Sequence, residues 1–266
     1  MRGKGELVYL LGMASLTPRD TVDQTKATIG ELGSRYMLHP ETMAIGTEAK
    51  YPNGFAWYMA GRGGVLGDVD ADVVYAAFGF FGPGLIRKMW EAGTAVEAPR
   101  AAGRRYAGAC AEFGRRRLQG AAGLERFNEL AGRVLASVDV SGLPLFAALR
   151  REPAPSDAAA LAYWNIALLR EWRGAEHVVA VRAAGLTPGQ AVLGDHADIE
   201  KGREQAKTRG FGEDVAEPSD LGDRRRRAEE ITSELQAPGY EVLTPDERSE
   251  FVSLVASLKD SLDANK

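Results

Sequence analysis

The chain has 266 residues, of which 45% are hydrophobic and 26% are charged, a balance typical of a globular protein with a buried core. This composition argues against wholesale disorder and against a fibrous repeat. Lysine and arginine total 33 against 37 acidic residues, and the resulting formal charge of −4 argues against a surface that binds nucleic acid throughout.

Cysteine and histidine are scarce. Cys110 is the only cysteine, which excludes an intramolecular disulfide and favours a buried thiol in a cytoplasmic protein. No apolar stretch reaches about 18 residues, and residues 1–12 lack the features of a signal peptide, so we expect neither export nor membrane insertion. No second histidine or cysteine lies at helical spacing from His39, His177 or His196, so we expect no dedicated metal site.

Apolar residues recur mostly at intervals of three and four, which predicts an all-α fold. In the first half of the chain we expect a first helix over residues 21–37. Residues 55–59 are apolar on every side, as in a buried helix, and the glycines that follow should end it. The next predicted helix follows Asp68 or Asp70 and carries apolar residues on two opposite faces, so it is also expected to be buried. Three more are predicted over 83–93, 100–118 and 124–138.

The second half contains the clearest helix. It should begin after Ser156 or Asp157 and carry Trp164 on a narrow apolar sector, with Arg170 pointing away from that sector. Gly174 is predicted to interrupt it, so that the next valines belong to a separate short helix.

Residues 187–190 and 244–247 predict the starts of two further helices, because threonine caps a helix and proline fits its first turn. Between them, residues 196–227 are rich in charge, glycine and proline, which indicates a mobile connection or a small eroded module. We therefore divide the chain into a helical ligand-binding region, 1–195, and a small C-terminal helical segment, 196–266.

The glycine-rich run at residues 61–67 has the composition of a phosphate-binding loop. Its spacing departs from the dinucleotide fingerprint, and helices rather than parallel strands are predicted after it. A helix-breaking turn is the favoured interpretation.

Two polar residues of the clearest helix are candidates for chemistry or polar recognition. Glu171 borders the apolar sector, where desolvation would raise its pKa unless Arg62 or His177 offsets the effect. His177 follows shortly after and is a candidate proton carrier. Both residues also have a purely structural interpretation, as hydrogen-bonded core groups.

Aromatic residues concentrate between residues 57 and 90, where glycines are interspersed. Such a region forms either a packed core or the lining of a pocket for a flat organic molecule. The candidate ligand-binding residues, which include polar groups beside this region, are Trp57, Tyr58, Arg62, Phe78, Phe81, Trp164 and Asn165.

The strongest basic run, residues 224–227, consists of four arginines. Glu229, Glu230 and Glu234 follow within one or two helical turns and are expected to pair with it. A solvated surface helix is therefore favoured over a phosphate-binding patch.

Several motifs resemble an actinobacterial family of helical proteins labelled MarR-like helix-turn-helix proteins. Residues 36–41, 61–67 and 73–78 carry the resemblance in that order. Residues 163–177 look like a family segment of two leucines, arginine, glutamate, histidine, arginine and glycine that ends in histidine, although Trp172 stands where relatives carry the first histidine. The resemblance covers roughly residues 30–195.

The resemblance implies a helical N-terminal region followed by a small winged helix-turn-helix, which would be degenerate here. Residues 194–230 are too short and too rich in glycine, proline and aspartate for a full recognition helix and wing, so we expect sequence-specific DNA binding to be weak or absent. The function expected is that of a cytoplasmic protein binding a small hydrophobic or aromatic molecule, as a ligand-responsive regulator or a sequestering protein. An enzyme using Glu171 and His177 as acid–base groups is the alternative. We also expect a homodimer; no cofactor can be named.

Overall fold

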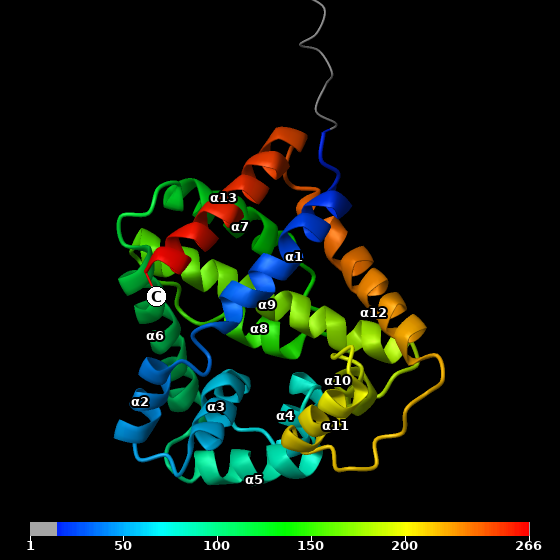
Figure 1. Ribbon diagram of the computed structural model, residues 1–266. Coiled ribbons are helices and arrows are strands. Elements are labelled where there is room, and N and C mark those ends of the chain that lie inside the picture. Colours follow the sequence, from blue (N-terminus) through cyan, green and yellow to red (C-terminus); the bar gives the residue numbers. More distant parts are fainter. Residues whose placement is uncertain (1–14, 266) are drawn as a thin grey trace, which may run out of the picture.

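The computed structural model describes residues 15–265, which fold entirely into helices and connections, without a β-strand (Figure 1). The all-α prediction is thereby confirmed. The expectation for residues 1–12 lies outside the described residues. The α-helices are α1 (Pro18–Ser34), α2 (Pro40–Glu48), α3 (Gly54–Gly63), α4 (Ala71–Phe78), α5 (Pro83–Thr94), α6 (Pro99–Leu118), α7 (Leu124–Ser137), α8 (Pro144–Arg150), α9 (Ala158–Ala183), α10 (Pro188–Leu193), α11 (Ile199–Thr208), α12 (Leu221–Gln236) and α13 (Pro245–Ala264). Two 3-10 turns, η1 (Gly64–Leu66) and η2 (Ala237–Tyr240), complete the fold.

Local sequence explains where many of these helices begin. Thr17, Thr187 and Thr244 each form a capping box with the residue three positions later, followed by proline in the first turn. Asn53 and Asp157 accept backbone N–H groups at the starts of α3 and α9. The predicted starts near Asp157, Thr187 and Thr244 are confirmed.

Helix α9 is the centre of the fold, and α1, α6, α7 and α12 pack around it (Figure 1). It runs without a break through Gly174, so the predicted interruption there was wrong. A glycine inside a helix costs only about 1 kcal/mol, and packing against α12 on the following turns outweighs that cost. Val178 and Val179 therefore belong to α9.

Glycines at the end of α3 allow a close approach to α6. A Cβ on Gly61 would lie 2.5 Å from the Tyr106 ring, and one on Gly64 would lie 2.0 Å from the carbonyl oxygen of Pro99. The run at 61–67 therefore ends α3 and packs helix against helix, in agreement with the helix-breaking interpretation.

Helix α4 is buried on one side only. Val74 and Phe78 are buried, whereas Val73 is 45% exposed. The prediction that apolar residues on both of its faces would be buried was therefore wrong for Val73, because α5 covers α4 from one direction.

Two hydrophobic clusters hold the helices together. The main cluster includes Trp172 of α9 together with Phe251 and Val255 of α13. The smaller one joins Val181 at the end of α9 to Leu193 of α10 and to buried residues of α12. Residues from both sides of position 195 contribute to each cluster.

Helices α10 and α11, on either side of residue 195, form a close pair. A Cβ on Gly202 of α11 would lie 1.9 Å from the carbonyl oxygen of Leu193, at the end of α10. The exposed residues of α11 carry both signs of charge, with Glu200 and Glu204 beside Lys201 and Lys207. This mixture does not form the basic stripe that typically contacts phosphates.

The four arginines of α12 are all paired with carboxylates. Arg227 contacts Glu230 and Glu234, as predicted. The others pair with Asp220, Asp195 and Asp223. The expected contact of Glu229 with this run was wrong, because Glu229 points toward Arg173 of α9.

Candidate ligand pocket

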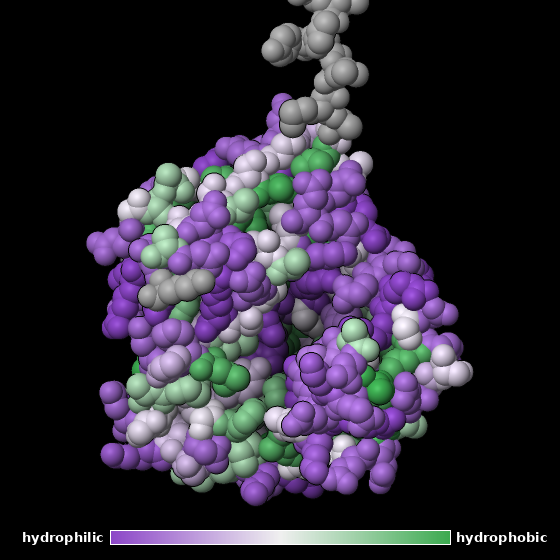
Figure 2. Space-filling model, in the orientation of Figure 1, coloured by the Kyte–Doolittle hydropathy of each residue, from purple (hydrophilic) through white to green (hydrophobic). Residues whose placement is uncertain are grey.

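A pocket of about 660 Å³ opens between α1 and α9 on one side and α3 and α4 on the other, where Figure 2 shows a hollow in the surface. Its volume lies within the range of about 300–1,000 Å³ that is usual for small-molecule sites. The residues that line it come from α1, α3, α4, α9 and α12 and from three connecting segments. They are Gly30, Ser34, Arg35, Met37, Leu38, His39, Tyr58, Arg62, Ala77, Phe78, Phe80, Phe81, Arg170, Glu171, Arg173, Gly174, His177, Arg209 and Glu229.

An aromatic cluster forms one wall of the pocket. The ring centroids of Tyr58, Phe78 and Phe81 lie 5.9 to 6.4 Å apart, in tilted or edge-to-face pairs. Phe80 lies 5.6 Å from the imidazole of His177. Such rings offer a flat ligand both faces and edges for contact.

A buried ion pair lies beside this wall. Arg62 donates from Nη2 to Glu171 Oε1 at 2.5 Å and from Nε to Oε2 at 3.1 Å, and Arg170 Nη1 donates to the same Oε2 at 3.2 Å. Burial disfavours the charged carboxylate, but the two guanidiniums outweigh it and hold the pKa of Glu171 below its usual value. Glu171 is thus ionised at neutral pH.

Besides Glu171, two aromatic residues contact Arg62. Its guanidinium lies 4.3 Å from the Phe78 ring centroid, and Nη1 donates to the hydroxyl oxygen of Tyr58 at 3.1 Å. The expected partnership of Glu171 with Arg62 is therefore present, whereas His177 makes no contact of this kind.

His177 is oriented by α12. The Thr232 hydroxyl donates to the Ala228 carbonyl oxygen at 2.7 Å, so it accepts the Nδ1–H of His177 at 2.8 Å. The Nε2 of the neutral ring then carries a lone pair. Burial lowers the pKa of His177, even though the Glu229 carboxylate lies 3.7 Å from Nε2.

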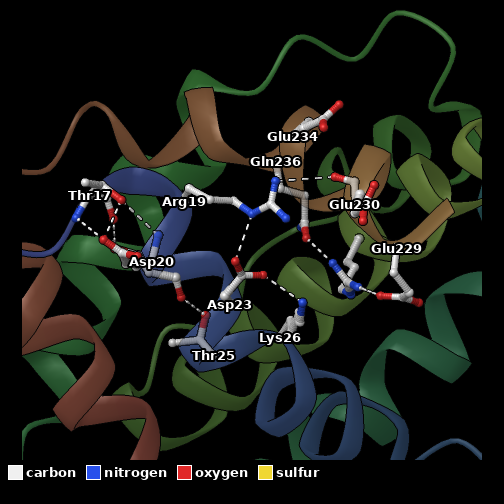
Figure 3. A network of polar contacts seen from close by, with 12 residues as sticks. Thr17, Arg19, Asp20, Asp23, Thr25, Lys26, Glu229, Glu230, Glu234 and Gln236 are labelled. Carbon is white, nitrogen blue, oxygen red and sulfur yellow. Dashed lines mark hydrogen bonds and ion pairs between the residues drawn. The ribbon is translucent and has the colours of Figure 1, made fainter. Parts of the chain in front are cut away.

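Arg173 connects the pocket to α12 through two hydrogen bonds. It donates to Gln236 Oε1 at 2.8 Å and to Glu229 Oε2 at 2.5 Å. Figure 3 shows Glu229 and Gln236 near the polar side chains of α1, among which Arg19 approaches the Glu230 carbonyl oxygen at 3.5 Å. Hydrogen bonds therefore link the pocket-lining Arg173 to α12, and α12 in turn to α1.

Six of the nine candidate residues line the pocket: Tyr58, Arg62, Phe78, Phe81, Glu171 and His177. Trp57, Trp164 and Asn165 do not. Trp57 is fully buried and donates its indole N–H to the Thr42 carbonyl oxygen at 2.9 Å. Trp164 is 3% exposed, and Asn165 donates to the side chain of Asn128 at 3.1 Å. These three residues face the core side of their helices.

The polar face of α9 was not expected to form a pocket wall. Arg170, Arg173 and Gly174 share helical spacing with the candidate His177, and all four line the pocket. That spacing was visible in the sequence, but a polar face is normally solvated. Phe80, Arg209 and Glu229 reach the pocket from elsewhere in the chain, and no local pattern indicates this.

The described residues contain no cluster of three or more histidine, cysteine, aspartate or glutamate side chains arranged to hold a metal ion. Within the same range, no helix has the length and apolar character needed to cross a bilayer.

Comparison with known proteins places the chain in a family. A family model described as a helix-turn-helix family matches residues 22–266, so the chain belongs to that family. No curated protein and no solved structure matches it.

Proposed function

We propose that this member of the helix-turn-helix family is a cytoplasmic protein of MarR-like ancestry that binds a small hydrophobic or aromatic molecule in the α1–α9 pocket. The observation that carries the proposal is the aromatic wall of Tyr58, Phe78 and Phe81 inside a pocket of about 660 Å³. A flat apolar molecule would bury its surface against these rings, which is the main source of affinity in such sites.

The position of the pocket favours a ligand-responsive role over simple sequestration. Arg173 and His177 line the pocket and also contact Glu229 and Thr232 of α12. Arg209, which directly follows α11, lines the same pocket. A ligand touching these side chains would change the relative stability of arrangements of α11 and α12, which is the requirement for coupling between two sites.

The enzymatic alternative has weaker support. Both oxygens of Glu171 are already occupied by the guanidiniums of Arg62 and Arg170. The low pKa that these contacts produce suits neither a general acid nor a strong base at neutral pH.

Two glycines provide a matched test. Gly174 lines the pocket inside α9, and a Cβ there would meet no atom within 4 Å. Gly108 lies in α6, outside the pocket lining, and is equally open. We expect the neutral fluorescent probe N-phenyl-1-naphthylamine to bind the wild type and Gly108→Phe, and to bind Gly174→Phe at least tenfold more weakly with little change in thermal midpoint.

Native mass spectrometry of freshly purified protein completes the test. It should show an additional small mass on the wild type that Gly174→Phe lacks, and it reports whether the chain is the expected homodimer. Equal probe binding by the wild type and Gly174→Phe would contradict a pocket at this position.

A further inference from the structure

The pocket contains more cations than anions. Five arginines line it, at positions 35, 62, 170, 173 and 209, against two glutamates, at 171 and 229. Arg35 is neutralised from outside the pocket by Glu31 and Asp263, and Arg173 by Glu229 within it. His177 adds no charge at neutral pH, because burial lowers its pKa.

Two of the remaining arginines share one carboxylate. Arg62 takes the bidentate position on Glu171, and Arg170 reaches only one of its oxygens, with a single N–H. The described residues offer Arg170 no other acceptor. One guanidinium charge therefore stays without a counterion at this point, on a side chain that is 25% exposed.

Arg209 has no carboxylate at all. Its guanidinium lies 5.7 Å from the ring centroid of Phe81, and it makes neither an ion pair nor a hydrogen bond within the described part of the chain. Its backbone is fixed, because the carbonyl oxygen of Arg209 accepts the N–H of Gly82 at 2.7 Å. The cation is thus held at the pocket next to the aromatic wall.

Partly desolvated cations without counterions favour the binding of an anion, since a charge-assisted hydrogen bond is about twice as strong as a neutral one. We propose that the ligand is an amphipathic anion, with a flat apolar body against Tyr58, Phe78 and Phe81 and one acidic group facing Arg170 or Arg209. This inference rests on the proposed function and specifies the ligand class. A carboxylate fits especially well, because its two oxygens match a guanidinium fork.

The test compares two probes of the same shape. 2-Naphthoate carries a carboxylate, and 2-naphthamide replaces it with a neutral amide. In isothermal titration calorimetry at low salt, we expect 2-naphthoate to bind the wild type at least tenfold more tightly than 2-naphthamide.

Single variants then locate the charge. Arg209→Gln and Arg170→Gln should each weaken 2-naphthoate several-fold, leave 2-naphthamide unchanged and so reduce the preference for the anion. Arg226→Gln is the matched control, because it removes one positive charge from α12 at a side chain that is 71% exposed and outside the pocket lining. Its affinities should equal those of the wild type. Arg209→Gln removes no described ion pair, so its folding should be preserved.

The outcomes separate the two proposals. If both probes bind equally, or if neither Arg209→Gln nor Arg170→Gln changes the preference, the anionic ligand is wrong while the pocket remains. If neither probe binds and N-phenyl-1-naphthylamine also fails to bind, the proposed function itself is wrong.

Discussion

Arg62 of α3 and Glu171 of α9 form a bidentate ion pair, with nitrogen–oxygen distances of 2.5 and 3.1 Å, although 109 residues separate them in sequence. The pair lies at the boundary between the aromatic wall and the core. Glu171 is 2% exposed and the side chain of Arg62 is 10% exposed. A buried pair of this kind contributes little net stability as a whole, but the loss of one partner strands a buried charge.

Glu171→Gln should therefore lower the free energy of unfolding by about 3 kcal/mol, because it leaves Arg62 and Arg170 without their carboxylate. Urea denaturation at pH 7 measures the change. Glu204→Gln on the exposed face of α11 is the control and should leave stability within about 0.5 kcal/mol of the wild type. Stability equal to the wild type, combined with lost probe binding, would show that Glu171 serves ligand recognition rather than structure.

His177 should make folding sensitive to mild acid. A histidine in the unfolded chain has a pKa of about 6.5. Burial holds the pKa of His177 in the folded chain below that value. Below about pH 6.5 the unfolded state thus binds more protons, and the free energy of unfolding falls as the pH drops. Groups facing His177 that enter this balance are Glu229, Arg173, Asp195 and Arg225.

The measurement is urea denaturation at pH 7 and at about pH 5.5, which stays above the range where unperturbed carboxylates titrate. His177→Gln should lose less stability between these two pH values than the wild type does. His196→Gln, at an exposed histidine, should behave like the wild type. An identical pH dependence in the wild type and His177→Gln would contradict the prediction.

The approach of η1 to α6 should be intolerant of a single added methyl group. In Gly64→Ala the new Cβ would lie 2.0 Å from the Pro99 carbonyl oxygen and 2.8 Å from the Gly103 nitrogen. Both are backbone atoms that cannot rotate away, so we expect a loss of about 2–3 kcal/mol.

Gly108→Ala is the counterpart in an open helical position and should raise stability by about 0.5–1 kcal/mol, through the lower entropy of the unfolded chain. Thermal unfolding of both variants checks the pair. If Gly64→Ala melts at the wild-type temperature, the close packing of η1 against α6 is wrong.

DNA binding should be weak and without sequence preference. The arginines of α12 are already paired, for example Arg225 with Asp195 at 3.0 Å and Arg227 with Glu234 at 3.1 Å, and a phosphate would have to displace these carboxylates. Selection from a random duplex library at about 0.15 M salt should enrich no sequence. Any retardation at about 0.05 M salt should fade steeply as salt is added. Recovery of one preferred sequence would restore a repressor role.

Local sequence determined much of the fold. The predicted helices over 100–118 and 124–138 match α6 and α7 closely, and the threonine–proline starts match α10 and α13. These features depend on residues within four positions of each other, because capping and helical periodicity are local interactions. The division at residue 195 stays a prediction.

Only the tertiary structure decided which side chains share the pocket. Periodicity shows that a residue faces the core or the solvent, but it does not show what lies opposite. Trp57 was expected in the pocket and packs in the core instead, whereas Arg209 comes from beyond α11 to stand beside Phe81. Gly174 remains helical because packing outweighs its low helix propensity. Contacts across more than a hundred residues, such as that between Arg62 and Glu171, leave no local pattern in the sequence.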